Sequence, residues 1–103
     1  MPTHHKSDLL VVTPTLGRRM TLHRTIRSVR NYCHHTAAHV IVGPTGIRSY
    51  LLNLYPWIYF LEDDSGLGIF HAVNMALEKY QNYEYFAFIN DDDYWLPGFA
   101  ALI

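Results

Sequence analysis

The feature that most constrains the fold is an alternation along the chain between short apolar runs and segments with helical periodicity. The apolar runs end at Pro, Gly or acidic residues, as strands usually do, and they occupy residues 8–13, 38–42, 57–61 and 85–89. In the intervening segments apolar side chains recur every three or four positions, at residues 19–32, 47–54 and 67–80. Strands that alternate with helices form βαβ units with right-handed crossovers. We therefore expect an α/β, Rossmann-like fold with about four mostly parallel strands, in the order 3-2-1-4, flanked by helices.

The same periodicity predicts which side chains form the core. The expected buried stripes of the first and third helices are Leu22, Ile26, Val29 and Cys33, and Ile69, Val73, Ala76 and Tyr80. The run from Tyr85 to Ile89 has almost no polar side chain, which favours a strand buried on both faces of a parallel sheet. Beyond it, Pro97-Gly98 predicts the start of another helix.

Length and charge exclude several classes of protein. A chain of 103 residues, half of them hydrophobic, is expected to form one domain, 1–103, with a real core. Its net charge of −1 gives no overall attraction to nucleic acid or anionic membranes, and its single cysteine excludes an internal disulfide. No window approaches ~18 uninterrupted apolar residues, and the polar residues 1–8 do not resemble a signal peptide. We expect no transmembrane segment and a cytoplasmic location.

An amide and three carboxylates, Asn90-Asp91-Asp92-Asp93, follow the last apolar run directly. In open α/β sheets, ligands bind beyond the carboxyl ends of the strands. Three adjacent carboxylates repel one another, so a compact site that holds them needs a cation. Oxygen ligands favour magnesium, manganese or calcium over zinc. The alternative is a solvated acidic turn or helix start, where Asp is common.

Three blocks of the sequence carry a family resemblance. Residues 11–18, V-V-T-P-T-L-G-R, resemble an opening strand with a P-T-x-x-R turn. Residues 68–77, G-I-F-H-A-V-N-M-A-L, are similar to a G-I-Y-D-A-M-N-K-G-I helix, and residues 88–97, F-I-N-D-D-D-Y-W-L-P, are similar to the F-L-N-x-D-D-x-W-x-P pattern of a D-x-D region. Each block alone is a weak motif, but the ordered set resembles the N-terminal, nucleotide-sugar-binding half of a family 2 glycosyltransferase with the GT-A fold.

The resemblance implies transfer of a sugar from a nucleotide-diphospho-sugar donor to an acceptor hydroxyl on a glycan, lipid or protein. The end of the first strand, Thr13, Pro14 and Thr15, would lie under the nucleotide base and ribose, and Arg18 belongs to the same turn. Asp64, just past the third strand, would line the base or phosphate side of the cleft.

The resemblance also assigns roles to the later blocks. Asn74 would face the cleft, although a helix Asn bonded to neighbouring backbone explains it equally well. Asn90 and Asp91 belong to the donor site, with Asp91 on the ribose hydroxyls. Asp92 would ligate the Mg²⁺ or Mn²⁺ ion that bridges the two phosphates, and Asp93 is either a second ligand or the residue that orients Asp92.

The chain also departs from the family pattern. Val42-Gly43-Pro44-Thr45 stands where many members carry an Asp-Asp pair that reads the base, and His71 replaces the Asp of the second block. Donor identity therefore stays open. Nothing corresponds to the family's downstream general base, so we expect no catalytic residue here and a chain that binds rather than transfers. The apolar end Phe99–Ile103 suggests a fragment that self-associates through this end.

Two other functions remain as alternatives. A non-catalytic nucleotide-binding module, or a remnant of a transferase, would share every site residue named above. A metal-dependent phosphotransfer domain could use the acidic cluster, but such folds usually place acidic residues after the first strand, where this chain has Thr13-Pro14-Thr15. Neither a P-loop nor a G-x-G-x-x-G pattern is present.

Overall fold

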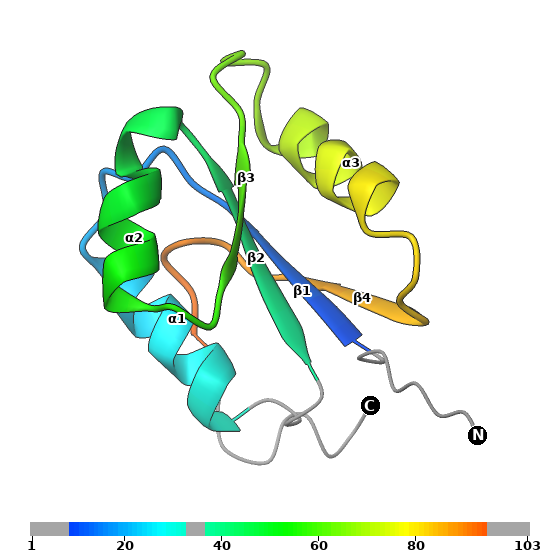
Figure 1. Cartoon of the computed structure of the whole chain (residues 1–103), viewed down its shortest axis with the longest axis horizontal. Coiled ribbons are helices and arrows are strands. Elements are labelled where there is room, and N and C mark those ends of the chain that lie inside the picture. Colours follow the sequence, from blue (N-terminus) through cyan, green and yellow to red (C-terminus); the bar gives the residue numbers. More distant parts are fainter. Residues whose placement is uncertain (1–8, 33–36, 95–103) are drawn as a thin grey trace.

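The computed structural model describes residues 9–32 and 37–94, and in them the predicted α/β fold is confirmed. The strands pair in the order β3-β2-β1-β4, every neighbouring pair is parallel, and helices cover both faces of the sheet (Figure 1). In chain order the elements are β1 (Leu9–Pro14), α1 (Thr21–Tyr32), β2 (Ala38–Gly43), the 3-10 turn η1 (Thr45–Ile47), α2 (Arg48–Leu54), β3 (Tyr59–Glu62), α3 (Ile69–Lys79) and β4 (Tyr85–Phe88).

The central strands β1 and β2 are buried because successive side chains point to opposite faces, and both faces are covered. On one face the two strands pack against α3, in a cluster formed by Leu10, Val12, Val40, Val42, Ala72 and Ala76. On the other face α1 and α2 surround β2, in a cluster formed by Leu22, Ile26, Ile41, Leu51, Tyr55 and Ile58. The helices therefore hold the sheet from both sides and leave its carboxyl edge open.

Two expectations about burial are wrong. The last strand is not buried on both faces, since Tyr85, Phe86 and Phe88 are 56%, 46% and 49% exposed. The reason is that β4 lies at one edge of the sheet, while α3 packs on β1 and β2. In α3 the first residue of the expected stripe, Ile69, is half exposed, and Ala72 takes the buried position one turn later.

The predicted element boundaries differ from the observed ones by one or two residues. The third strand begins at Tyr59 rather than at 57, because the chain turns there and the Ile58 N–H donates to the Tyr55 carbonyl at 3.1 Å. Cys33, the expected helix at Pro97-Gly98 and the apolar end of the chain lie outside the described residues. Within residues 9–32 and 37–94, no helix has the length and apolar character needed to cross a bilayer.

Candidate functional site

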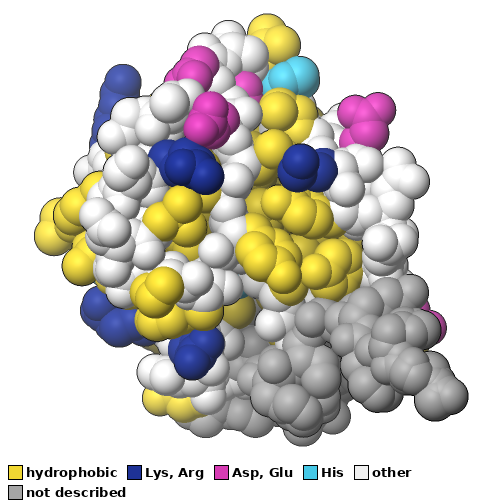
Figure 2. Space-filling view, viewed as in Figure 1, with side chains coloured by type: hydrophobic (Ala, Val, Ile, Leu, Met, Phe, Trp, Pro, Cys, Tyr) yellow, Lys and Arg dark blue, Asp and Glu magenta, His cyan; other side chains and the backbone are white. Residues whose placement is uncertain are grey.

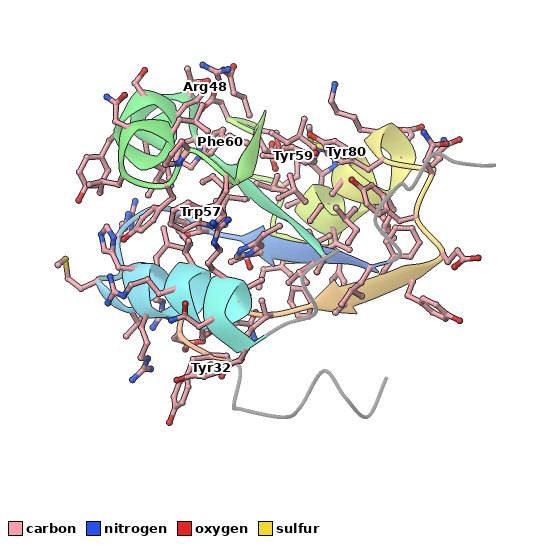
Figure 3. The ribbon with its side chains drawn as sticks, turned by 60° about the horizontal axis from the view of Figure 1, so that its bottom comes forward. Tyr32, Arg48, Trp57, Tyr59, Phe60 and Tyr80 are labelled. Carbon is pink, nitrogen blue, oxygen red and sulfur yellow. The ribbon has the colours of Figure 1, made fainter. Side chains whose placement is uncertain are left out.

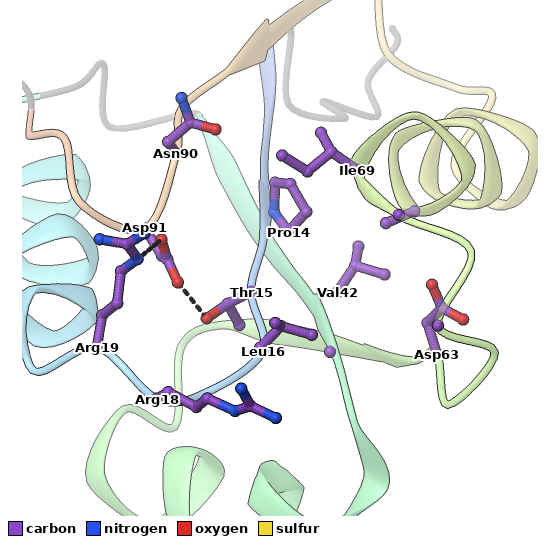
Figure 4. Close-up of a pocket in the computed structure, with 14 residues that line it drawn as sticks. Pro14, Thr15, Leu16, Arg18, Arg19, Val42, Asp63, Ile69, Asn90 and Asp91 are labelled. Carbon is purple, nitrogen blue, oxygen red and sulfur yellow. Dashed lines mark hydrogen bonds and ion pairs between the residues drawn. The ribbon is translucent and has the colours of Figure 1, made fainter.

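A cavity of about 560 Å³ opens at the carboxyl ends of the strands (Figure 4). The last residues of β1 and β2 and the segments that follow β1, β3 and β4 contribute to it, together with the start of α3. Its lining consists of Pro14, Thr15, Leu16, Arg18, Arg19, Val42, Gly43, Asp63, Gly66, Gly68, Ile69, Ala72, Asn90 and Asp91. The chain leaves β1 toward β2 on one side, whereas β4 lies on the other side of β1. The cavity therefore occupies the point where the strand order reverses, the usual ligand position in open α/β sheets.

The floor of the cavity is closed by the end of β2. The Thr15 N–H donates to the Val42 carbonyl at 2.9 Å, and the Asp63 N–H donates to the Gly43 carbonyl at 2.7 Å. A Cβ at Gly43 would stand 2.9 Å from the Thr15 carbonyl oxygen. Because that neighbour is backbone, only glycine allows the segment after β1 to approach the end of β2 so closely.

Thr15 connects the turn after β1 to the segment Asn90–Asp93 after β4, which we call the acidic loop. Its hydroxyl donates to Asp91 Oδ2 at 2.7 Å and accepts the Gly17 N–H at 2.9 Å. The other oxygen of the Asp91 carboxylate lies 3.4 Å from Arg19 Nε. The Asp91 side chain is only 14% exposed. Each of its oxygens has a contact that helps to fix its orientation and can still accept a further hydrogen bond (Figure 4).

The main chain of the acidic loop is fastened to α1. The Thr21 hydroxyl donates to the Asp91 carbonyl at 2.9 Å, and the Thr25 hydroxyl donates to the Asp93 carbonyl. Arg24 Nη2 lies 3.4 Å from the Asp92 carbonyl oxygen. These contacts use carbonyl oxygens, so they position the loop without consuming the carboxylates of Asp92 and Asp93.

Two features of the cavity favour an anionic ligand. Arg18 and Arg19 both line it, and within the described residues Arg18 makes no ion pair. The start of α3 forms another part of the wall, with Gly68 as the N-cap residue and no side-chain cap. The first N–H groups of a helix without a side-chain cap remain available to an anion.

The two acidic residues after β3, Asp63 and Asp64, make different contacts. Asp63 lines the cavity, opposite Asp91 and Arg19 in Figure 4. Its Oδ1 accepts the Ser65 hydroxyl at 2.6 Å and the Ser65 N–H at 3.0 Å, and these bonds hold the pKa of the Asp63 carboxyl below its usual value. Asp64 instead accepts the Thr45 hydroxyl at 2.5 Å and the Thr45 N–H at 2.9 Å, and the same bonds lower its pKa.

The structure brings together five of the residues predicted from the sequence. These are Pro14, Thr15, Arg18, Asn90 and Asp91, all in the lining of the cavity. Asp64, Asn74 and the two predicted metal ligands, Asp92 and Asp93, are exposed and lie outside the lining. Arg19 and Asp63 were missed, although each stands next to a predicted residue and the charge of each was visible in the sequence.

Thr13 also lies outside the lining. Its side chain is fully buried, and its hydroxyl is 2.7 Å from His39 Nε2. Burial lowers the pKa of His39 to about 3, so this imidazole is neutral at physiological pH. The other ring nitrogen, Nδ1, is buried and has no hydrogen-bond partner within residues 9–32 and 37–94. In this structure the Thr13–His39 pair belongs to the core rather than to the cavity.

The acidic loop has ligand atoms for part of a metal coordination shell. The Asp92 side chain is 47% exposed and has Arg19 Nη1 at 3.6 Å, and the Asp93 carboxylate has Asn90 Nδ2 at 3.4 Å. Among the described residues no three or more His, Cys, Asp or Glu side chains are grouped to hold a metal. The donor set fits a magnesium-like ion that takes one or two carboxylates and completes its shell with water and ligand phosphates.

No model of a known protein family matches the chain, and a comparison with curated proteins gave no significant match.

Proposed function

We propose that this chain binds a nucleotide-diphospho-sugar and forms the donor-binding half of a glycosyltransferase. The observation that carries the proposal is the cavity at the reversal point between β1 and β4. It is lined by residues from the P-T-x-x-R turn, Pro14, Thr15 and Arg18, and by Asn90 and Asp91 of the acidic loop. These segments are more than 70 residues apart in the chain and meet through the Thr15–Asp91 bond.

The chemistry of the lining suits the parts of such a donor. Pro14, Val42 and Ile69 offer apolar surface for a base or a sugar face, while the Asp91 carboxylate accepts hydrogen bonds from ribose hydroxyls. Arg18 and the start of α3 provide positive potential for the diphosphate. A volume of about 560 Å³ is also within the range of ligand pockets, roughly 300 to 1,000 Å³.

A divalent ion, Mg²⁺ or Mn²⁺, is part of the proposal. Asp92 would hold it, with Asp93 as a second ligand or as the residue that orients Asp92. When bound, the ion would stabilise the negative charge that develops on the departing diphosphate. The role of the chain itself is to present the Asp92 carboxylate beside the cavity, on a loop that α1 holds in place.

The proposal assigns binding and orientation to this chain and no catalytic residue. Deprotonation of the acceptor hydroxyl needs a general base, and no residue of the cavity is assigned to that task. The non-catalytic alternative, a nucleotide-binding module, uses the same cavity and differs only in turnover.

The test is calorimetric titration of the chain with UDP, GDP, ADP and CDP, each with and without Mn²⁺. We expect tighter binding of at least one diphosphate when Mn²⁺ is present. Asp92→Ala removes the ligand carboxylate and should abolish most of this gain while metal-free binding changes little. Glu84→Gln is the matched control, because it removes an exposed carboxylate at the start of β4, outside the cavity.

Two results would contradict the proposal. The first is equal nucleotide affinity with and without Mn²⁺ in both the wild type and Asp92→Ala. The second is an Asp92→Ala protein that loses ~1 kcal/mol of stability with no change in binding, because that result identifies Asp92 as a local cap rather than a ligand.

A further inference from the structure

The outer edge of β3 is an open strand edge surrounded by aromatic side chains. β3 is the end strand of the described sheet, at the opposite edge from β4. Figure 1 views the molecule from this edge, with α2 on one side of β3 and α3 on the other. In the same view hydrophobic side chains gather over β3 and the adjoining parts of both helices (Figure 2). No described residue pairs with this edge of the strand.

Aromatic rings flank the edge on both faces of the sheet. On the α3 face Tyr59 is stacked on Tyr80, with ring centroids 5.7 Å apart and an interplanar angle of 13°. On the α2 face lie Phe60 and Trp57, and Trp57 contacts Tyr55 edge-on at 5.5 Å (Figure 3). Tyr59 and Trp57 remain 45% and 37% exposed.

β3 is a short edge strand of four residues that carries neither lysine nor proline. Exposed edges are normally blunted by lysine, proline, bulges or inward-pointing charges. The strand reads Tyr-Phe-Leu-Glu, and its only charge is at its last position. Rings of Tyr and Trp together with nearby Arg are the composition that protein interfaces favour.

The direction of the free backbone groups of β3 follows from its pairing with β2. The Asp63 N–H donates to the Gly43 carbonyl, so Asp63 faces β2. Alternate residues of a parallel strand bond to opposite neighbours, so Tyr59 and Leu61 also face β2, while Phe60 and Glu62 direct their N–H and C=O groups outward. The outward groups are those that a further strand would bond.

We propose that this edge pairs with the same edge of a second copy, antiparallel, about a two-fold axis through Phe60. The two Phe60 residues then exchange N–H···O=C bonds, and the Glu62 N–H of each copy meets the Ile58 carbonyl of the other. Tyr59 stands opposite Leu61 of the second copy, on the α3 face of both molecules. Both the backbone pattern and the side-chain faces agree with this register, and the two sheets become continuous.

Charge complementarity selects a second copy as the occupant. Glu62 lies at the carboxyl end of β3. Its side chain is 47% exposed, and its Oε2 lies 3.4 Å from Arg48 Nε of the same copy, which leaves the carboxylate able to take a second cationic partner. At the amino end the Arg30 guanidinium lies over the Trp57 ring, 4.4 Å from its centroid, and has no carboxylate partner among the described residues. Antiparallel pairing brings Glu62 of each copy toward Arg30 of the other, so both ends of the interface gain opposite charges.

Sedimentation velocity of the whole chain, measured up to about 100 µM, tests the proposal, because a Kd near 10 µM would then populate the dimer. We expect a dimer. Phe60→Arg places two like charges face to face on the axis and should raise the dimer Kd by at least about tenfold. Phe86→Arg makes the same change to an exposed phenylalanine of the opposite edge strand, β4, and should leave the dimer intact.

The Phe60 ring partly packs on the core, so Phe60→Arg could disrupt the dimer by disturbing the fold. A charge exchange tests the interface independently. Glu62→Arg and Arg30→Glu should each weaken the dimer, and the double variant should restore it. A wild-type chain that stays monomeric overturns the proposal. A dimer that persists in Phe60→Arg also overturns it, as does a dimer that Phe86→Arg disrupts instead. Failure of the double charge-exchange variant to restore the dimer has the same consequence. Each of these results would place the dimer contact on another surface, for example the apolar C-terminal end.

Discussion

The buried imidazole of His39 should make the fold sensitive to mild acid. His39 is 4% exposed, and its Nε2 lies 2.7 Å from the Thr13 hydroxyl. Burial lowers its pKa from 6.5 to about 3, because the charged form cannot be solvated in the core. As the pH falls below 6.5 the unfolded chain binds a proton at this residue and the folded chain does not. Stability is therefore complete above pH 6.5 and is lost as the pH falls toward 3.

The size of the effect follows from the two pKa values. Each pH unit between them is worth about 1.4 kcal/mol, so the full loss for a fall from 6.5 to about 3 is about 5 kcal/mol. Between pH 7 and pH 5, a range that carboxylates with ordinary pKa values hardly affect, linkage predicts a loss of about 2 kcal/mol from His39 alone. Set against a total stability of roughly 5 to 15 kcal/mol, this loss is readily measurable.

Urea denaturation at pH 7, 6 and 5 gives the free energy of unfolding of the wild type and of His39→Gln. The glutamine keeps a polar group for the Thr13 hydroxyl but does not titrate. The variant starts from a lower stability, so the informative quantity is the change with pH. We expect the wild type to lose about 2 kcal/mol more than the variant between pH 7 and pH 5. Parallel pH curves for the two proteins would refute the reasoning.

Two further changes test the cavity. Thr15→Val removes the hydroxyl that bonds Asp91 and Gly17. It should lower the free energy of unfolding by ~1–3 kcal/mol in urea denaturation and weaken nucleotide binding in calorimetry. Unchanged values for both would show that the position of Asp91 does not depend on the Thr15 hydroxyl. Gly43→Ala sets a Cβ 2.9 Å from the Thr15 carbonyl oxygen and should lower the unfolding free energy by ~1–3 kcal/mol. Gly46→Ala is the control, because open space surrounds its Cβ and no clash is expected. Equal stability of the two variants would contradict the close approach of Gly43 to Thr15.

The fold could be predicted from the sequence because its signals are local and repeated. Each strand is an apolar run with a clear stop, and the intervening helices carry the helical period. Right-handed crossovers then restrict the strand order to few choices. Burial of β4 was predicted wrongly because an apolar run does not reveal whether a helix covers its strand. Phe86 and Phe88 have the composition of a buried strand but the position of an edge.

The site was predicted less completely, since it depends on how segments face each other across the sheet. The turn that begins at Pro14 and the loop at Asn90 were found because both lie at the carboxyl ends of apolar runs. The choice between Asp63 and Asp64 depends on the register of β3. Leu61 packs on the α3 face, where the cavity lies, and Asp63 shares that face because side chains alternate. The family resemblance assigned Asp64, and it carries no information about the register of β3.

In the acidic loop, the atoms that hold the loop in place differ from those that we propose bind a ligand. The carbonyls of Asp91 and Asp93 accept threonine hydroxyls from α1, and the Asp91 carboxylate is held by Thr15 and Arg19. A solvated acidic turn would need none of these long-range bonds, because its residues would be satisfied by water and local backbone. Among the described residues the Asp92 carboxylate has one partner, Arg19 Nη1 at 3.6 Å, and it is half exposed. A loop held in this way, with an accessible Asp92 carboxylate, supports our proposal of a cation site.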